Sequence, residues 1–138
     1  MVSSDENSEI GAIEVHAPYS VILIEGGPTK DIPHDLSDNV GATGSSIAVG
    51  TLSEQDGPTM LRLLLGDRDG PDAAGLRIFD GVIDAPAGNI SVRSVEGETY
   101  LALPVRTATV RLVITTNAAR EPSEIDIRVF ELQTLKGA

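Results

Sequence analysis

The segment 66–72, GDRDGPD, holds the densest group of side chains that could do chemistry in this sequence. Asp67, Asp69 and Asp72 stand at alternate or near-alternate positions around a glycine. Clustered carboxylates on a turn can hold Ca²⁺, because a hard cation prefers oxygen ligands. The segment lacks the glutamate with which an EF-hand loop chelates its ion, and no helical pattern flanks it. Since aspartate and glycine are also ordinary turn residues, the pattern favours a turn without a metal ion.

The two histidines, His16 and His34, are the next candidates for a metal or catalytic site. Together with Asp31 or Asp35 they could hold zinc or iron, because imidazole and carboxylate groups bind both metals. Their spacing matches no metal-binding motif, and the serines lack the Gly-x-Ser-x-Gly turn of a hydrolase nucleophile. Surface or packing histidines are the simpler interpretation. A small enzyme or metal-binding domain that uses His16, His34 and loop carboxylates stays open as an alternative.

The composition disfavours several other classes of function. The absence of Cys excludes disulfides, thiolate metal sites and a cysteine nucleophile. With no Trp and an aromatic content of 3%, the chain lacks the stacking platforms of carbohydrate-binding and nucleic-acid-binding proteins. The stretch 41–44, GATG, lacks the following lysine of a phosphate-binding loop. We therefore expect no cofactor, no bound metal and no enzyme activity.

The charge is strongly unbalanced: 21 Asp and Glu face 10 Lys and Arg, which gives a formal net charge of -11. Such a charge repels nucleic acid and anionic membranes, and it favours encounter with a basic protein in a salt-sensitive way. Solubility alone is the simpler explanation of the acidity. If carboxylates bind a partner, the candidates lie in one polar loop and the Asp-rich turn: Asp31, His34, Asp35, Asp38, Asp67, Asp69 and Asp72.

The elements that would position these side chains are short strands. Apolar and polar residues alternate in ISVRSV at 90–95, in TVRLVIT at 109–115 and in IDIRV at 125–129. This pattern is typical of an antiparallel sheet with one packed face and one wet face, so most arginines are expected on exposed faces beside acids. TMLRLLL at 59–65 has helical propensity, but flanking turns shorten it and favour a buried strand. Strands are expected at 13–16, 19–25, 45–53, 59–66, 76–84, 89–95, 98–104, 108–115 and 124–133.

Strands at this spacing predict an all-β fold, a single-domain antiparallel β-sandwich of about eight strands with an aliphatic core. Residues 12–138 form the expected domain, and residues 1–11 form an expected disordered acidic tail. Pro18 predicts a break, and the sequence VEGE at 95–98 predicts a tight hairpin. The long polar stretch 28–44 is expected to be a binding loop, an excursion over a sheet edge or disorder.

The first residues, MVSSDENSEIG, lack the basic segment and apolar stretch of a signal peptide. The longest apolar run, Val21–Ile24, is far too short to span a bilayer. We therefore expect a cytoplasmic protein without membrane contact.

The segment 14–25, EVHAPYSVILIE, resembles the first strand of the competence protein J family, small inhibitors of a DNA-entry nuclease. A polar loop with a Gly-Ala stretch then precedes Ser46–Val49, as in that family. The strand spacing stays similar over about residues 12–133, through these segments: Leu61–Leu64, Ile78–Ile83, Ile90–Val95, Tyr100–Pro104 and Val110–Thr115. The acidic tail and low aromatic content depart from the family.

The resemblance implies a non-enzymatic protein that blocks a nuclease. The acid excess fits this independently, because a nuclease cleft is basic and a carboxylate-rich surface can occupy it. The leading prediction is thus an acidic protein-binding module that inhibits a basic partner such as a nuclease. A structural domain whose edges or faces pair with copies of itself, and so a homo-oligomer, is the second alternative beside the metal-binding one.

Overall fold

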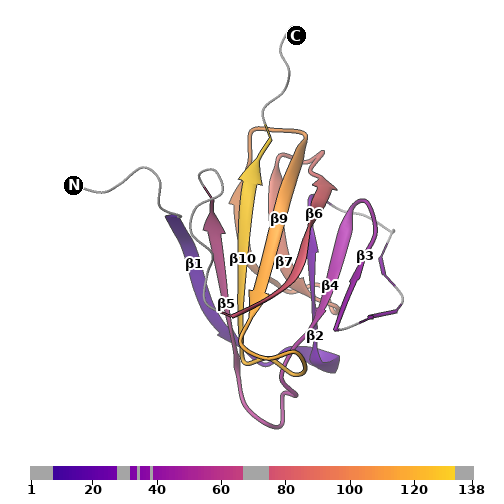
Figure 1. The fold of residues 1–138 in the computed structure, drawn as a ribbon, viewed down its shortest axis with the longest axis vertical. Coiled ribbons are helices and arrows are strands. Elements are labelled where there is room, and N and C mark those ends of the chain that lie inside the picture. Colours follow the sequence, from indigo (N-terminus) through magenta and orange to yellow (C-terminus); the bar gives the residue numbers. More distant parts are fainter. Residues whose placement is uncertain (1–7, 28–31, 34, 38, 67–74, 133–138) are drawn as a thin grey trace, which may run out of the picture.

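The chain folds into two five-stranded sheets that pack face to face (Figure 1). The computed structural model describes residues 8–27, 32–33, 35–37, 39–66 and 75–132. They form ten strands and one short 3₁₀ helix. The all-β sandwich predicted from the spacing of strands and turns is confirmed.

The first sheet has the order β1-β5-β10-β9-β6 and the second the order β3-β4-β2-β7-β8. In chain order the strands are β1 (Ser8–Val15), β2 (Val21–Glu25), β3 (Val40–Ala42), β4 (Ser46–Gly50), β5 (Thr59–Leu65), β6 (Leu76–Asp84), β7 (Asn89–Ser94), β8 (Thr99–Pro104), β9 (Thr109–Thr116) and β10 (Glu124–Glu131). All described pairings are antiparallel except that of β10 with β5, which is parallel. The sandwich is thus mainly antiparallel, as expected, with one parallel pair. A parallel neighbour needs a long connection, and the whole second half of the chain supplies it.

The core is aliphatic, as predicted, and the alternation of residues identifies which side chains form it. The buried positions predicted for the last strands all have relative exposures near zero: Ile90, Val92, Val110, Leu112, Ile114, Ile125, Ile127 and Val129. Isoleucines of β2 and leucines of β5 complete the interior from the two sheets. Full burial of such a side chain stabilises the fold by about 1.5–3 kcal/mol, so the interior is the main source of stability.

The strand boundaries show where the pattern was incomplete. β1 begins at Ser8, inside the range expected as tail, because Ser8 already pairs with Leu65 of β5. The three residues of β3 were missed, since Gly41 and Ala42 give no alternation. The break at Pro18 is confirmed as a 3₁₀ turn over Pro18–Ser20. The segment 59–65 is the buried strand expected, not a helix.

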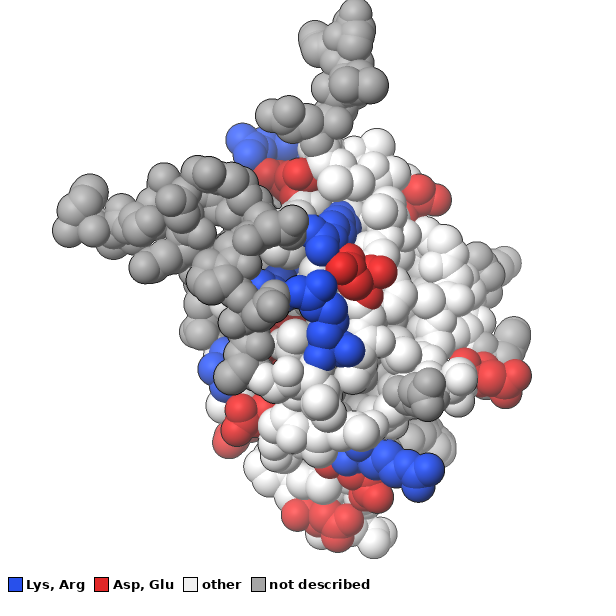
Figure 2. All heavy atoms as spheres, viewed as in Figure 1, with Lys and Arg blue, Asp and Glu red and all other residues white. Residues whose placement is uncertain are grey.

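Arginines on the outer face of the first sheet pair with acids, as predicted. Asp80 lies 2.8 Å from Arg111, and Arg62 lies 3.3 Å from Asp126. Figure 2 shows acidic and basic side chains interleaved over the middle of this face. Arg128 corrects the expectation of exposed arginines, since it is only 3% exposed. Its guanidinium lies 5.9 Å from the ring centroid of Phe130, which shields it from water.

Acid is expected to weaken the fold partly through Asp80. Its carboxylate accepts hydrogen bonds from Arg111, and these chiefly lower the pKa of Asp80 from the ordinary 3.8, with burial opposing. A group whose pKa is lowered in the folded state stabilises the protein above the unfolded value and loses that contribution as the pH falls through the folded value. We expect Asp80→Asn to be less stable than the wild type at neutral pH and to lose less stability below about pH 3.8.

Urea unfolding at a series of pH values measures this difference. Asp84→Asn is the matched control, because Asp84 makes no ion pair within the described part of the chain. If Asp80→Asn and Asp84→Asn both lost as much unfolding free energy in acid as the wild type, Asp80 would not be a source of the acid sensitivity.

Candidate functional site

Few of the predicted site residues lie in the part of the chain that the structure describes. Asp35 is described and exposed, in the segment that lies over β3 next to Gly41. The other predicted binding residues lie outside the described residues: Asp31, His34, Asp38, Asp67, Asp69 and Asp72. His16 is exposed, with its Nδ1 atom 3.3 Å from the carbonyl oxygen of Glu54. In the part of the chain that is described, no three His, Asp or Glu side chains gather as a metal site would require.

Carboxylates instead gather at one end of the sandwich. Five described arginines, at positions 62, 77, 93, 106 and 111, form ion pairs with acids. Other acids have no ion pair among the described residues, and five of them lie in the β4–β5, β7–β8 and β9–β10 loops: Glu54, Asp56, Glu96, Glu98 and Glu121. We call this set the acidic end. The β4–β5 and β9–β10 loops lie at the lower end of Figure 1. Arg120 lies in one of the same loops, so five acids and one arginine, all without an ion pair among the described residues, give this end a net negative charge.

Contacts between the loops hold the acidic end together. The β4–β5 loop bonds to the β9–β10 loop through the amide of Leu52, which donates to the carbonyl of Pro122 at 2.9 Å. The pKa of Tyr100 is raised, first by burial and then by the charge of Glu98. Glu96 and Glu54 raise this pKa further, while a hydrogen bond with Ser94 lowers it. The charges of two loops therefore act on one phenol.

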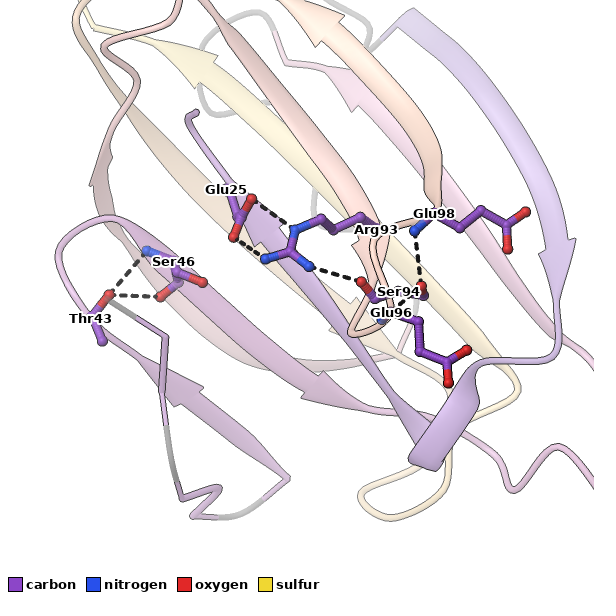
Figure 3. Close-up of polar contacts among 7 residues, drawn as sticks. All are labelled: Glu25, Thr43, Ser46, Arg93, Ser94, Glu96 and Glu98. Carbon is purple, nitrogen blue, oxygen red and sulfur yellow. Dashed lines mark hydrogen bonds and ion pairs between the residues drawn. The ribbon is translucent and has the colours of Figure 1, made fainter. Parts of the chain in front are cut away.

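Ser94 fixes the hairpin turn that carries two of these acids (Figure 3). Its Oγ accepts hydrogen bonds from the amides of Glu96 and Glu98, each at 3.1 Å. The amide of Ser94 also donates to the carbonyl of Glu98 at 2.8 Å, which closes the hairpin predicted from VEGE. Gly97 takes a φ of 101°, which a side chain would disfavour. The backbone is thus satisfied internally, and both glutamate side chains stay exposed.

An ion pair between Glu25 and Arg93 anchors this hairpin to β2 (Figure 3). The Arg93 guanidinium donates to both carboxylate oxygens of Glu25, from Nε to Oε1 at 2.9 Å and from Nη2 to Oε2 at 2.7 Å. This hydrogen bonding is the main reason that the pKa of Arg93 is raised. A third donor, Nη1, reaches the carbonyl of Ser94 at 3.0 Å. The position of the acidic turn therefore depends on a largely buried charge pair behind it.

A groove runs beside the acidic end, over the outer face of the second sheet. Its apolar part has a volume of about 420 Å³ and lies between β2, β4 and the residues at 32, 33, 36 and 39. Leu23 and Ala48 form its floor, with Tyr19, Leu36 and Val95 among its walls. A second hollow of about 720 Å³ continues it toward β6. Both hollows share three lining residues: Leu36, Asn39 and Glu121. We call the first hollow the apolar groove.

The apolar groove is built on unusual backbone. Among the described residues, the non-glycine positions with a left-handed φ are Tyr19 at 61°, Ser20 at 58°, Asn39 at 70° and Glu121 at 46°. All of them line the apolar groove. Asparagine adopts this conformation readily, but tyrosine does so at a steric cost. Such strain clusters at functional sites, where the surroundings hold it in place.

Tyr19→Gly is expected to raise the free energy of unfolding by about 0.5–1 kcal/mol. Relief of the left-handed strain, about 1–2 kcal/mol, outweighs the extra freedom that glycine gains on unfolding. Little burial is lost, because Tyr19 is 79% exposed. Urea unfolding measures the effect, and Ile13→Gly on the extended β1 is the control that should lose stability. A destabilised Tyr19→Gly protein would show that the ring has a structural role.

The residues of the acidic end and of the apolar groove are not among those that the sequence pattern predicts as binding residues. The sequence carries two signals of them: two glutamates that flank the glycine of a predicted hairpin tip, and a tyrosine directly after Pro18 in a chain with two tyrosines. Neither signal shows which loops meet at one end of the fold.

The described residues contain no helix with the length and apolarity needed to cross a membrane.

Comparison with known proteins supports the fold. No family model matches the chain, and no curated protein sequence matches it. It is similar to ComJ from Bacillus subtilis, described as an inhibitor of the DNA degrading activity of NucA. The TM-score is 0.68 at 9% identity, over 92% of this chain and 99% of that one. It is also similar to a structure described as crocagin biosynthetic gene J, with a TM-score of 0.55 at 13% identity over 93% and 98% of the two chains. The resemblance to the competence protein J family is thereby confirmed at the level of the fold.

Proposed function

We propose that this chain is a non-enzymatic binding protein that inhibits a nuclease through its acidic end. The observation that carries the proposal is the set of five carboxylates in three loops at one end, unpaired among the described residues. Similarity in fold to ComJ supports the nuclease as the class of partner. Asp35 and the residues at 31, 34, 38, 67, 69 and 72 stay candidates for contact with the partner.

The physical basis is charge complementarity. A nuclease binds phosphates with lysines and arginines, and these cationic groups also attract a carboxylate-rich surface that fits the cleft. A fixed cluster of carboxylates competes for the same cleft without being a substrate. Charge attraction of this kind speeds association and weakens with salt, because exposed charges are screened within about 8 Å at physiological ionic strength.

The test is protection of DNA from degradation. The DNase activities of the source cells are separated by chromatography, and each fraction is assayed on linear DNA with and without micromolar purified chain. We expect one DNase activity to be blocked in a stoichiometric way at low salt, with the block relieved at high salt. A complete set of fractions that all degrade DNA at an unchanged rate would contradict the proposal.

A further inference from the structure

We propose that the apolar groove receives one apolar side chain of the partner, and that a lysine or arginine next to that side chain pairs with Glu121 and the hairpin acids. This inference deepens the proposed function and rests on it for the identity of the partner. The occupant is thus a short segment in which an apolar and a basic residue are adjacent.

The groove offers apolar surface that the fold leaves open. Six large apolar side chains of the described residues are exposed, and three of them line the apolar groove: Tyr19 at 79%, Leu36 at 40% and Val95 at 37%. A fourth, Leu76 at 47%, lines the adjoining hollow. Exposed apolar side chains that gather around one concave surface, with charged groups at its rim, mark an interaction site.

The charges around the groove select the occupant. Glu121 lines both hollows, and Val95 of the groove wall is followed directly by the exposed Glu96. The adjoining hollow also contains Arg120, which forms no ion pair among the described residues, and Arg77, which pairs with Asp80 at 3.3 Å. A basic residue of the partner is therefore attracted toward Glu121 and the hairpin acids and disfavoured next to Arg120. This polarity fixes the direction in which the segment lies.

The groove is formed before the partner arrives. The amide of Gly50 donates to the carbonyl of Asn39 at 3.1 Å, and Nδ2 of Asn39 donates to the carbonyl of Gly50 at 2.9 Å. The amide of Thr51 donates to the carbonyl of Ser20 at 2.8 Å. These bonds hold two of the left-handed residues in the groove wall. A site that is already ordered loses little conformational entropy on binding.

Titration of the ¹⁵N-labelled chain with three blocked peptides tests the inference by nuclear magnetic resonance. The probe is acetyl-Gly-Phe-Arg-Gly-amide, and the controls replace either Arg by Gln or Phe by Ser. We expect shifts at the amides of Tyr19, Leu36 and Val95, with the probe binding about fivefold more tightly than either control at low salt. Equal binding of the three peptides, shifts confined to other surfaces, or no shift at millimolar peptide would overturn the inference.

Matched variants sharpen this result. Val95→Ser should weaken binding of the probe, while Val82→Ser, at a position 55% exposed on β6, should not. Glu121→Gln should reduce the preference for Arg over Gln, and Glu14→Gln, on the exposed face of β1, should retain it in full. Retention of full preference by Glu121→Gln would overturn the assignment of the basic residue.

The nuclease assay separates this inference from the function on which it rests. If the wild type blocks a DNase and Val95→Ser blocks it equally well, the groove has no role in binding and the proposed function survives. If the peptide occupies the groove but the chain blocks no DNase, the proposed function fails while the chemistry of the groove is supported.

Discussion

Replacement of Arg93 by methionine is expected to lower the free energy of unfolding by about 2–3 kcal/mol. The variant keeps the aliphatic volume of Arg93 but leaves the Glu25 carboxylate, whose side chain is 5% exposed, without its bidentate partner. Loss of one member of a fully buried ion pair costs about 3–5 kcal/mol, and the 21% exposure of Arg93 places this pair below that range. Loss of the bond to Ser94 should also loosen the acidic hairpin.

The two partners should not be equivalent. In Glu25→Leu, the Arg93 guanidinium can turn toward water, so we expect a loss of only about 1 kcal/mol. The double variant, Glu25→Leu with Arg93→Met, should be more stable than Arg93→Met alone, because two apolar side chains replace the charge pair. Urea unfolding of all four proteins at neutral pH gives the coupling energy. A double variant whose loss equals the sum of the single losses would show that the two groups act independently.

The second large effect concerns binding. Glu96→Gln together with Glu98→Gln should weaken inhibition of the partner nuclease at low salt by about tenfold, which corresponds to 1.4 kcal/mol for two charge contacts. Both carboxylates are exposed, and the bonds that fix their turn come from backbone amides, so the fold should be unchanged.

The matched control for these variants removes a charge at the opposite end of the sandwich: Asp84→Asn at the end of β6, where the next residue, Ala85, bonds to Ala108. We expect its inhibition constant to stay within about twofold of the wild type, because exposed charges farther than a Debye length contribute little. If Asp84→Asn and the single variants Glu96→Gln and Glu98→Gln all lost the same amount, net charge rather than the acidic end would govern binding.

The sequence predicted the fold more fully than the site, for a physical reason. Alternation in ISVRSV and in IDIRV depends on neighbours along one strand, so the buried faces followed from local pattern. The parallel pairing of β5 with β10 depends on residues about 60 positions apart, for which a local pattern carries no information. The division of the chain into an N-terminal tail and one domain stays a prediction, and the strand that begins at Ser8 shortens the expected tail.

The site depends on which loops meet in space. Glu54 and Glu98 lie in loops that several strands separate along the chain, and the charges of both raise the pKa of Tyr100 because the fold brings these loops to the same end. Likewise, the left-handed φ of Tyr19 has no signature in its residue type, since tyrosine ordinarily avoids that conformation. The excess of acid in the sequence indicated a basic partner but could not show which carboxylates the arginines leave unpaired.

Hydrogen–deuterium exchange of the chain, alone and bound to the nuclease that it inhibits, shows whether the acidic end is the binding surface. We expect the complex to slow exchange in the loop at 52–58, in the hairpin turn at 95–98 and around Tyr19. We also expect unchanged exchange at the opposite end, in the connection 105–108. Slower exchange confined to that connection or to β6, with the acidic end unaffected, would show that the partner binds elsewhere.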